Sequence, residues 1–355
     1  MFRFLTAGES HGPALTIIVD GLPAGLEVSE AAINEELKRR QGGYGRGGRM
    51  TIEKDEVRIT GGVRLGRTLG SPVAMIIENR DWSNWTEAMR VAAPVLPEGP
   101  GEDAALRRIR APRPGHADLA GALKTGTHDV RDVLERASAR ETASRVAAGA
   151  LARQLLAFFG IRIASHTIGV GAISSPRGSE TPWAEIAAIP ADSPLRCADP
   201  GVEAAMMAEV DRARATRDSL GGVFQVVARG VPPGLGSCRL WDTRLEARLG
   251  QALLSIHAIK AVEIGDGVAA ASRFGSQVHD EIFHDSVLRR FFRKTNRAGG
   301  IEGGMTNGEE VRATAYVKPL STLPRPMHSV DLVDKTEVEA TVERTDTCVI
   351  AAAGV

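Results

Sequence analysis

The order of hydrophobic and polar residues along the chain predicts strands and helices that do not alternate regularly. Short apolar segments bounded by turn-forming residues predict strands at 14–20, 51–60, 73–78, 162–172, 222–229, 311–317 and 337–343. Apolar residues at helical spacing predict helices from 30 to about 40, from 138 to 159 and over 243–257. Because these elements do not repeat as strand–helix–strand units, the pattern favours an α+β architecture over a doubly wound sheet.

The ends of two predicted helices carry recognisable capping residues. Ser29 is a typical N-cap, and Gly42-Gly43 ends that helix. The Ser138-Ala-Arg-Glu141 segment has the form of a capping box, which predicts that the long helix starts at Ser138. Arg136 and Arg140 flank this predicted start, and a helix N-terminus attracts anions, so we expect an anion-binding site there.

Composition narrows the class of protein. The chain has 355 residues with 44 Lys and Arg against 44 Asp and Glu, so the net charge gives no reason to expect nucleic acid or an anionic membrane as partner. No apolar run approaches the ~20 residues of a membrane span, and the first residues lack the apolar stretch of a signal peptide. Three scattered cysteines suit a reducing compartment and predict no metal site. We therefore expect a cytoplasmic protein.

Glycine and arginine are clustered. Five glycines lie within 41–50 and five within 299–308, which indicates loops that turn tightly or approach a ligand closely. Arginines gather in three groups, and this residue favours phosphate and carboxylate. The groups comprise Arg39, Arg40, Arg46 and Arg49; Arg107, Arg108, Arg110 and Arg113; and Arg131, Arg136, Arg140 and Arg145.

Two short motifs suggest functions that their context does not support. Residues 43–48 match G-x-G-x-x-G, but they follow a predicted helix and precede a predicted strand, which is the reverse of a dinucleotide-binding turn. Residues 8–12 match G-x-S-x-G around Ser10, the nucleophile elbow of serine hydrolases. Only nine residues precede Ser10 and a strand follows it, so hydrolysis by Ser10 remains a remote alternative.

Two histidines lie in polar loops beside these clusters. His11 sits in the turn around Ser10, and His116 follows the proline-rich segment 110–115. Histidine titrates near neutral pH, and loops on rigid scaffolds carry function disproportionately. Together with the arginines and glycines, they indicate acid–base chemistry on an anionic, phosphate-bearing ligand.

Several segments, taken together and in order from residue 1 to about 350, resemble the chorismate synthase family. They are GESHG at 8–12, GRGGRM at 45–50, NRDW at 79–82, RAPRPGHAD at 110–118, RASARETA at 136–143, EIGDG at 263–267, NRAGGIEGGMTNG at 296–308 and RTD at 344–346. The resemblance implies one β-α-β sandwich domain over 1–355, with helices packed between antiparallel sheets, assembled as a homotetramer. It also implies the anti-1,4-elimination of phosphate from 5-enolpyruvylshikimate 3-phosphate, a small phosphorylated molecule, to give chorismate with reduced FMN as cofactor. NADPH is a candidate reductant for the flavin.

The resemblance also assigns roles to individual residues. It implies that His11 is an acid near the departing phosphate, that His116 acts on the reduced flavin, and that Asp346 assists proton removal. Arg40 and Arg46 match positions for the anionic ligand or the nicotinamide cofactor. The residues that match flavin contacts are Ser138, Ala139, Arg140, His257, Ala258, Gly303, Lys318, Pro319, Leu320, Ser321, Thr322 and Arg344.

The chain departs from the family pattern in two places. Thr125-Gly-Thr-His128 stands where family members commonly have Tyr-Gly-His. The chain stops at Val355, soon after Cys348, so we expect the family's C-terminal helix to be shortened or absent. The second departure keeps open the alternative of a non-catalytic flavin- or phosphate-binding homologue.

Overall fold

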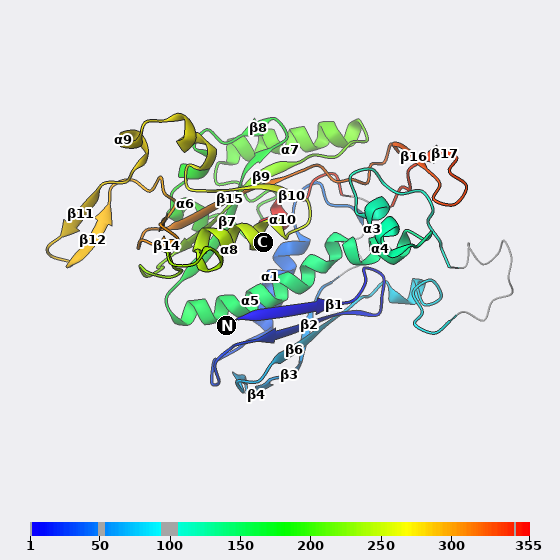
Figure 1. Cartoon of the computed structure of the whole chain (residues 1–355), viewed down its shortest axis with the longest axis horizontal. Coiled ribbons are helices and arrows are strands. Elements are labelled where there is room, and N and C mark those ends of the chain that lie inside the picture. Colours follow the sequence, from blue (N-terminus) through cyan, green and yellow to red (C-terminus); the bar gives the residue numbers. More distant parts are fainter. Residues whose placement is uncertain (1, 49–53, 94–105, 344–345) are drawn as a thin grey trace. The chain divides into compact units, whose positions relative to one another are not determined.

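The computed structural model describes residues 2–48, 54–93, 106–343 and 346–355, and these fall into two compact units. Unit 1 comprises 1–154, 213–219 and 320–347, and unit 2 comprises 155–212, 220–319 and 348–355. Each unit is built on one antiparallel sheet with helices against it, and we describe each by itself (Figure 1). The predicted α+β class is confirmed.

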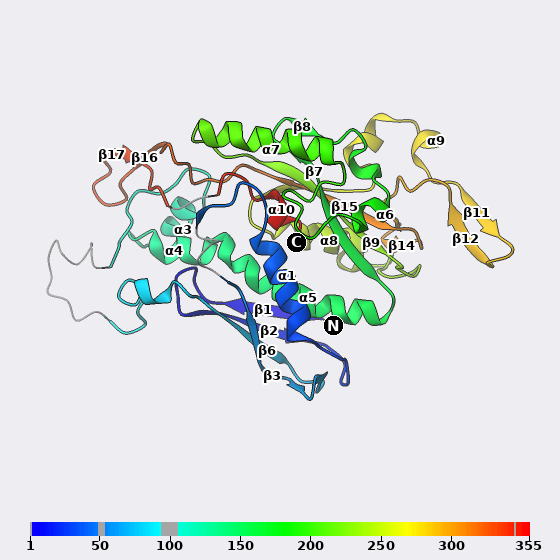
Figure 2. The ribbon, with the colours of Figure 1, turned by 180° about the vertical axis from the view of Figure 1, so that it is seen from behind.

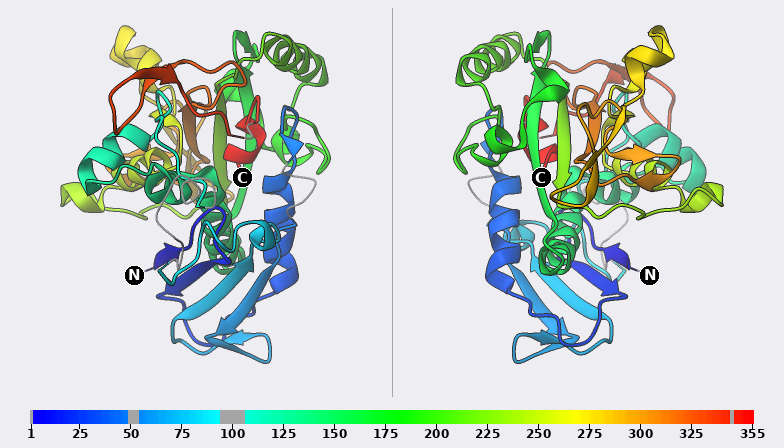
Figure 3. Two further views of the ribbon diagram at one scale, coloured as in Figure 1. Left: turned by 90° about the vertical axis from the view of Figure 1, so that its right-hand side faces the viewer. Right: turned by 90° about the vertical axis from the view of Figure 1, so that its left-hand side faces the viewer.

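Unit 1 contains a four-stranded sheet in the order β1-β2-β6-β3. Alternate residues of the two central strands are fully buried, because one face of the sheet packs on helices; they include Leu15, Ile17, Met75 and Ile77. Helix α1 runs beside this sheet and buries Ile33 and Leu37 (Figures 2 and 3). The elements are β1 Arg3–Ala7, β2 Ala14–Asp20, α1 Glu30–Gln41, β3 Val57–Gly61, β4 Val63–Arg64, β5 Arg67–Thr68, β6 Val73–Glu78, η2 Trp82–Asn84, α3 Asp118–Thr125, α4 Arg131–Ala137, η3 Ala139–Glu141, β16 His328–Val330 and β17 Glu337–Glu339.

Unit 2 contains a five-stranded sheet in the order β10-β15-β9-β7-β8. Its strands β9 and β15 pair in register from Gly222 opposite Val317 to Ala228 opposite Val311. The elements are β7 Arg162–Val170, β8 Ile173–Ser174, η4 Gly178–Glu180, α6 Trp183–Ala187, β9 Gly222–Arg229, η5 Trp241–Thr243, α8 Leu245–Leu254, β10 Ile259–Ile264, η6 Gly267–Ser272, α9 Gly275–Val278, β11 Ile282–Asp285, β12 Arg290–Arg293, β13 Ile301–Glu302, β14 Met305–Thr306, β15 Val311–Val317 and α10 Ile350–Ala353. Two helices, α5 Thr142–Phe158 and α7 Pro200–Ala215, continue from one unit into the other.

The structure corrects the predicted start of the long helix. Its first turn, η3, is a 3₁₀ turn, and the α-helix begins at Thr142 rather than Ser138. The Ser138 hydroxyl accepts from the Arg140 backbone N–H at 3.3 Å, and the Glu141 carboxylate accepts from the Thr6 hydroxyl and from Arg145. The Glu141 carboxylate thus links this turn to β1 and to the next turn of the helix.

Other boundaries are shorter than predicted. The strand predicted at 51–60 is β3, which begins at Val57, and residues 51–53 lie outside the described ranges. The strand predicted at 337–343 ends at Glu339, and the helix predicted over 243–257 is α8, which ends at Leu254. The C-terminal segment forms the short helix α10, whose Ile350 is fully buried against β7 and β9.

Candidate functional site

His11 lies in the turn between β1 and β2, and backbone geometry holds this turn in place. Gly8 has a φ of +102°, and a Cβ on it would lie 2.3 Å from the Ala14 carbonyl oxygen, so only glycine fits. The Asn79 side-chain amide donates to the carbonyl oxygens of Glu9 and Gly12, at 3.2 and 2.7 Å. The loop that presents His11 is therefore fixed at both ends.

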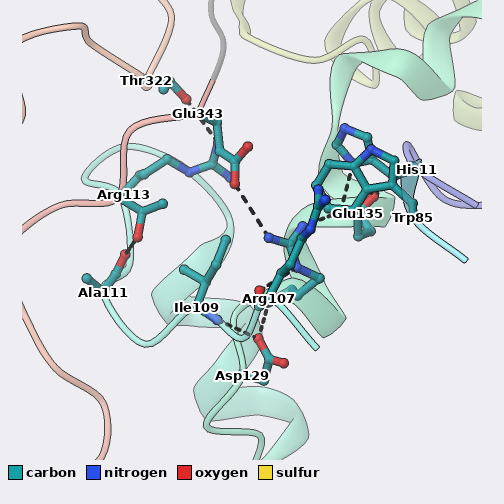
Figure 4. Close-up of polar contacts among 12 residues, drawn as sticks. His11, Trp85, Arg107, Ile109, Ala111, Arg113, Asp129, Glu135, Thr322 and Glu343 are labelled. Atoms are coloured by element: carbon teal, nitrogen blue, oxygen red, sulfur yellow. Dashed lines mark hydrogen bonds and ion pairs between the residues drawn. The ribbon is translucent and has the colours of Figure 1, made fainter. Parts of the chain in front are cut away.

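The imidazole of His11 rests between a carboxylate and an indole ring (Figure 4). Its Nδ1 lies 2.9 Å from Glu135 Oε1, and its backbone N–H donates to Glu135 Oε2 at 2.9 Å. The ring stacks on Trp85 with centroids 3.9 Å apart. The guanidinium groups of Arg107 and Arg131 also lie over that indole, at 4.2 and 5.0 Å.

Glu135 is almost fully buried, with 2% of its side chain exposed. Burial by itself would raise its pKa, but hydrogen bonds and the charge of His11, followed by the charge of Arg131, lower the pKa below its usual value. Arg131 donates to Glu135 Oε1 at 2.7 Å. Glu135 is therefore ionised near neutral pH.

His116 has a second carboxylate partner. Its Nδ1 lies 2.5 Å from Asp118 Oδ1, and Asp118 is fully buried at the first residue of α3. Arg113 donates to both oxygens of Asp118 and to the Thr322 hydroxyl. Burial would raise the Asp118 pKa, but hydrogen bonds from His116 and Arg113 lower it well below its usual range.

The loop that carries His116 is supported by a distant part of unit 1. The Ser329 hydroxyl on β16 donates to the Pro112 carbonyl oxygen at 2.6 Å. The Thr341 hydroxyl donates to the Ala111 carbonyl oxygen at 2.8 Å. The segment 328–341 thus holds the residues before His116 in position, while α3 begins just after it.

Asp346 is held by the first glycine cluster. The Gly47 backbone N–H donates to Asp346 Oδ1 at 2.6 Å, and Arg46 Nε lies 3.2 Å from Oδ2. The Thr347 backbone N–H donates to the Gly45 carbonyl oxygen at 2.8 Å. The loop predicted to approach a ligand is therefore also the loop that orients this carboxylate.

Arg40 and Arg140 meet at one buried carboxylate, that of Asp55. Arg40 Nη1 lies 3.3 Å from Asp55 Oδ2, and Arg140 forms an ion pair with the other oxygen. Arg40 also donates to the Ala139 carbonyl oxygen at 2.9 Å, and Arg140 donates to Asn79 Oδ1 at 2.8 Å. Burial lowers the Arg40 pKa to about 10, which leaves the group cationic at neutral pH.

Ser138 and Ser10 are linked through their hydroxyl groups. The Ser138 hydroxyl donates to Ser10 Oγ at 3.1 Å. Ser10 is buried, and the loop that carries it runs into strand β2 instead of into a helix. A nucleophile elbow needs an exposed serine at a strand-to-helix turn, so the geometry gives no support to a serine hydrolase.

The remaining predicted flavin contacts are divided between the units. In unit 1, the Leu320 carbonyl oxygen accepts from Ser219 and the Ser321 hydroxyl donates to the Gly115 carbonyl oxygen, both at 2.8 Å; Thr322 is bound by Arg113. Arg344 lies outside the described residues.

In unit 2, Ala258 adopts a left-handed φ of +68°, uncommon for a residue with a side chain, and its carbonyl oxygen accepts from the Lys318 N–H at 2.9 Å. It follows His257, just beyond α8. Lys318 Nζ donates to the Pro319 carbonyl oxygen at 3.2 Å, and burial, followed by Lys260, lowers the Lys318 pKa. Gly303 is exposed, and a Cβ there would meet no atom within 4 Å.

Several residues that organise the site were not singled out from the sequence. Glu135, Asp118 and Asp55 are buried carboxylates that each hold a histidine or an arginine, and Trp85 supports His11. The only signal for Glu135 was its position four residues after Arg131, a spacing common to many surface pairs. The partners of these residues become apparent only when distant segments are brought together.

Comparison with known proteins identifies the family. The sequence profile described as chorismate synthase matches residues 2–355. The chain belongs to the chorismate synthase family. It is 54% identical over 354 residues to the chorismate synthase of Symbiobacterium thermophilum and 56% identical over 353 residues to that of Desulforudis audaxviator, covering 99% of this chain in both cases and 90% and 88% of the relatives.

The fold agrees with this assignment. A solved structure titled "Crystal Structure of Chorismate Synthase" matches with a TM-score of 0.74 and 42% identity, covering 90% of this chain and 84% of that one. The family eliminates phosphate from 5-enolpyruvylshikimate 3-phosphate to form chorismate in aromatic amino-acid biosynthesis, which is a carbon–oxygen lyase reaction, and it requires a reduced flavin. No helix within the described residues is long and apolar enough to cross a membrane.

Proposed function

We propose that His11 is the general acid of the chorismate synthase reaction in this chain. The observation that carries the proposal is the contact of His11 Nδ1 with the buried carboxylate of Glu135, which leaves Nε2 as the nitrogen available to a ligand. As the carbon–oxygen bond of the substrate breaks, the electron pair stays with the phosphate oxygen, and a proton from Nε2 neutralises it. A positioned general acid contributes ~10²–10⁴-fold to such a step.

The other two predicted catalytic residues have geometries that suit proton handling. His116 contacts Asp118 through Nδ1, as His11 contacts Glu135, but its backbone N–H donates to the Arg113 carbonyl oxygen instead of to the carboxylate. Asp346 is oriented by Arg46 and by the Gly47 N–H, and we propose that it assists removal of the ring proton.

Unit 1 carries the group types that bind a flavin phosphate and ring. Arg140 is a cation, and Ser138, Ser321 and Thr322 are hydroxyl residues, the groups that phosphate and carbonyl oxygens prefer. In this structure they bind Asp55, Ser10, the Gly115 carbonyl oxygen and Arg113, so a bound flavin would share or replace these partners. In unit 2, the open space around Gly303 would let a flat ring approach the backbone. When bound, the reduced flavin supplies electron density to the substrate as phosphate leaves. The protein's own residues would hold the ligand, donate a proton to the leaving phosphate and help to remove the ring proton.

We further propose that the flavin is FMN, that NADPH is a candidate reductant, that Arg40 and Arg46 serve the anionic ligands, and that the enzyme acts in the cytoplasm as a homotetramer. Anaerobic assays with reduced FMN, and separately with oxidised FMN and NADPH, distinguish a self-reducing enzyme from one that depends on an external reductant. Sedimentation of the purified protein tests the tetramer.

An anaerobic turnover assay tests the proposed roles. His11→Ala and His116→Ala should each reduce turnover by roughly one to three orders of magnitude with the fold retained. His328→Ala is a matched control, because this histidine is largely exposed on β16. Wild-type turnover in His11→Ala or His116→Ala would remove that histidine from the mechanism. Absence of chorismate formation by well-folded wild-type protein would favour a non-catalytic flavin- or phosphate-binding homologue.

A further inference from the structure

We propose that Glu135 is the positioning residue that binds the Nδ1 side of His11 and aims its Nε2 at the substrate. The proposal rests on the role given to His11 above, and it adds a residue that neither motif nor spacing indicates. It stands on one buried carboxylate that binds the same residue twice, through the ring Nδ1 and the backbone N–H.

The double contact fixes the orientation of the ring. The Glu135 carboxylate accepts from the His11 backbone N–H and lies 2.9 and 3.0 Å from Nδ1 with its two oxygens. An ionised carboxylate only accepts, so Nδ1 carries a hydrogen, and in the protonated ring the transferable proton is the one on Nε2. Stacking on Trp85 holds the plane of the ring, and the Trp85 indole N–H donates to Asp81 at 3.0 Å.

Charged groups of both signs lie around the ring. Arg107 and Arg131 lie over the Trp85 indole on which His11 stacks. Glu135 contacts the ring directly, and Arg131 in turn keeps Glu135 ionised. Among the described residues, Asp81 is bound to Trp85, Glu343 lies 3.7 Å from Arg131, and Glu9 lies two positions before His11 in the same turn.

The step is balanced without a change at Glu135. The carbon–oxygen bond breaks, the phosphate oxygen takes the electron pair and the proton from His11 Nε2, and the imidazole becomes neutral. The electron pair of the ring C–H bond, whose proton Asp346 helps to remove, enters the new double bond. Glu135 stays ionised throughout and exchanges no proton with the reacting groups.

Replacement of Glu135 tests the inference through a pH profile. In Glu135→Gln we expect kcat to fall ~10–100-fold with KM changed less than about threefold, and the alkaline limb of the kcat profile to move about one unit to lower pH. Glu343→Gln is the matched control, because it removes a carboxylate from the same arginine without touching His11. The control should keep both rate and profile.

A second variant separates charge from shape. Glu135→Asp retains the negative charge, so its alkaline limb should stay near the wild-type position even if the shorter side chain lowers kcat. This variant also covers the case in which Glu135→Gln does not fold. The inference would be overturned if the alkaline limb of the kcat profile moved equally in both variants, or if it did not move in Glu135→Gln.

The stacked indole gives a readout that needs no turnover. A protonated imidazole quenches a stacked tryptophan, so the fluorescence of wild-type protein minus that of Trp85→Phe should rise as pH increases and His11 loses its proton. We expect the midpoint of this rise to move to lower pH in Glu135→Gln and to stay in Glu343→Gln. In His11→Ala the rise should vanish.

The outcomes separate the two proposals. Wild-type turnover in His11→Ala would contradict the role of His11 itself. Slow turnover in His11→Ala, combined with an unchanged rate, pH limb and fluorescence midpoint in Glu135→Gln, would contradict only the role of Glu135.

Discussion

Arg140 and Asp55 form a buried ion pair although 85 positions separate them in the sequence. Both side chains are almost inaccessible, and Arg40 contacts the second oxygen of the same carboxylate. This contact joins the start of the long helix to the segment before β3. Arg40 and Arg140, which the sequence associates with ligand binding, therefore also stabilise the fold by pairing with Asp55.

Removal of the Asp55 carboxylate should therefore destabilise the fold. Asp55→Ala would leave two buried guanidinium groups without their shared anion, and breaking a buried pair from one side costs about 3–5 kcal/mol. Urea denaturation measures the change in the free energy of unfolding. Asp20→Asn is the control, because its pair with Arg3 is exposed and worth about 1 kcal/mol or less. Equal losses in the two variants would contradict the buried pair's structural role.

His166 on β7 should make stability depend on pH. Burial lowers its pKa to about 4, against 6.5 for the unperturbed side chain. Below about pH 6.5 the unfolded chain takes up a proton that the folded state refuses, so stability falls as pH decreases towards about 4. The full interval is worth about 3 kcal/mol.

His166→Gln isolates this contribution, because glutamine does not titrate. The difference in unfolding free energy between wild type and variant, measured in urea at several pH values, should favour wild type less as pH falls from 7 to 4. A difference that stays constant over this range would show that His166 is equally easy to protonate in both states.

The glycines of the second cluster should differ in their tolerance of alanine. A Cβ on Gly300 would lie 2.5 Å from the Glu310 carbonyl oxygen, whereas a Cβ on Gly303 would meet no atom within 4 Å. Gly300→Ala should thus reduce thermal stability severely, whereas Gly303→Ala should cost about 1 kcal/mol for its positive φ. If Gly303 approaches a flavin, its variant should weaken FMN binding in a fluorescence titration while melting near the wild-type temperature.

Asp346→Asn should separate function from stability. The asparagine keeps the shape and an acceptor for the Gly47 N–H, and the lost pair with Arg46 is partly exposed, so the fold should lose about 1 kcal/mol or less. Turnover should fall at least ~10-fold because a carboxamide does not accept a proton from the substrate. Wild-type turnover would remove Asp346 from proton transfer.

The central strands were predictable because their burial alternates or is complete. The predicted strands at 14–20, 73–78, 222–229 and 311–317 coincide with β2, β6, β9 and β15. β1 was not predicted, since it lies at the edge of its sheet with Leu5 and Phe4 exposed. The order of hydrophobic and polar residues reflects which positions are buried, so it gives little information for an edge strand that is half exposed to solvent.

The same limit explains what was missed in the site. His11 and His116 stood out because their chemistry is rare and their loops are polar. Glu135 and Asp118 did not, because a carboxylate on a helix is ordinary until it is buried beside a histidine. The long-range pairing that makes them distinctive arises from tertiary structure.

The loop that carries His116 depends on contacts with residues more than 200 positions later, through Ser329 to Pro112 and Thr341 to Ala111. During synthesis the loop leaves the ribosome long before segment 328–341 exists, so these contacts close late. An incomplete chain carries both histidines but lacks the support of one of them. The His116 loop therefore reaches its final position only near the end of folding. Growing chains should remain inactive until almost the whole protein has been made.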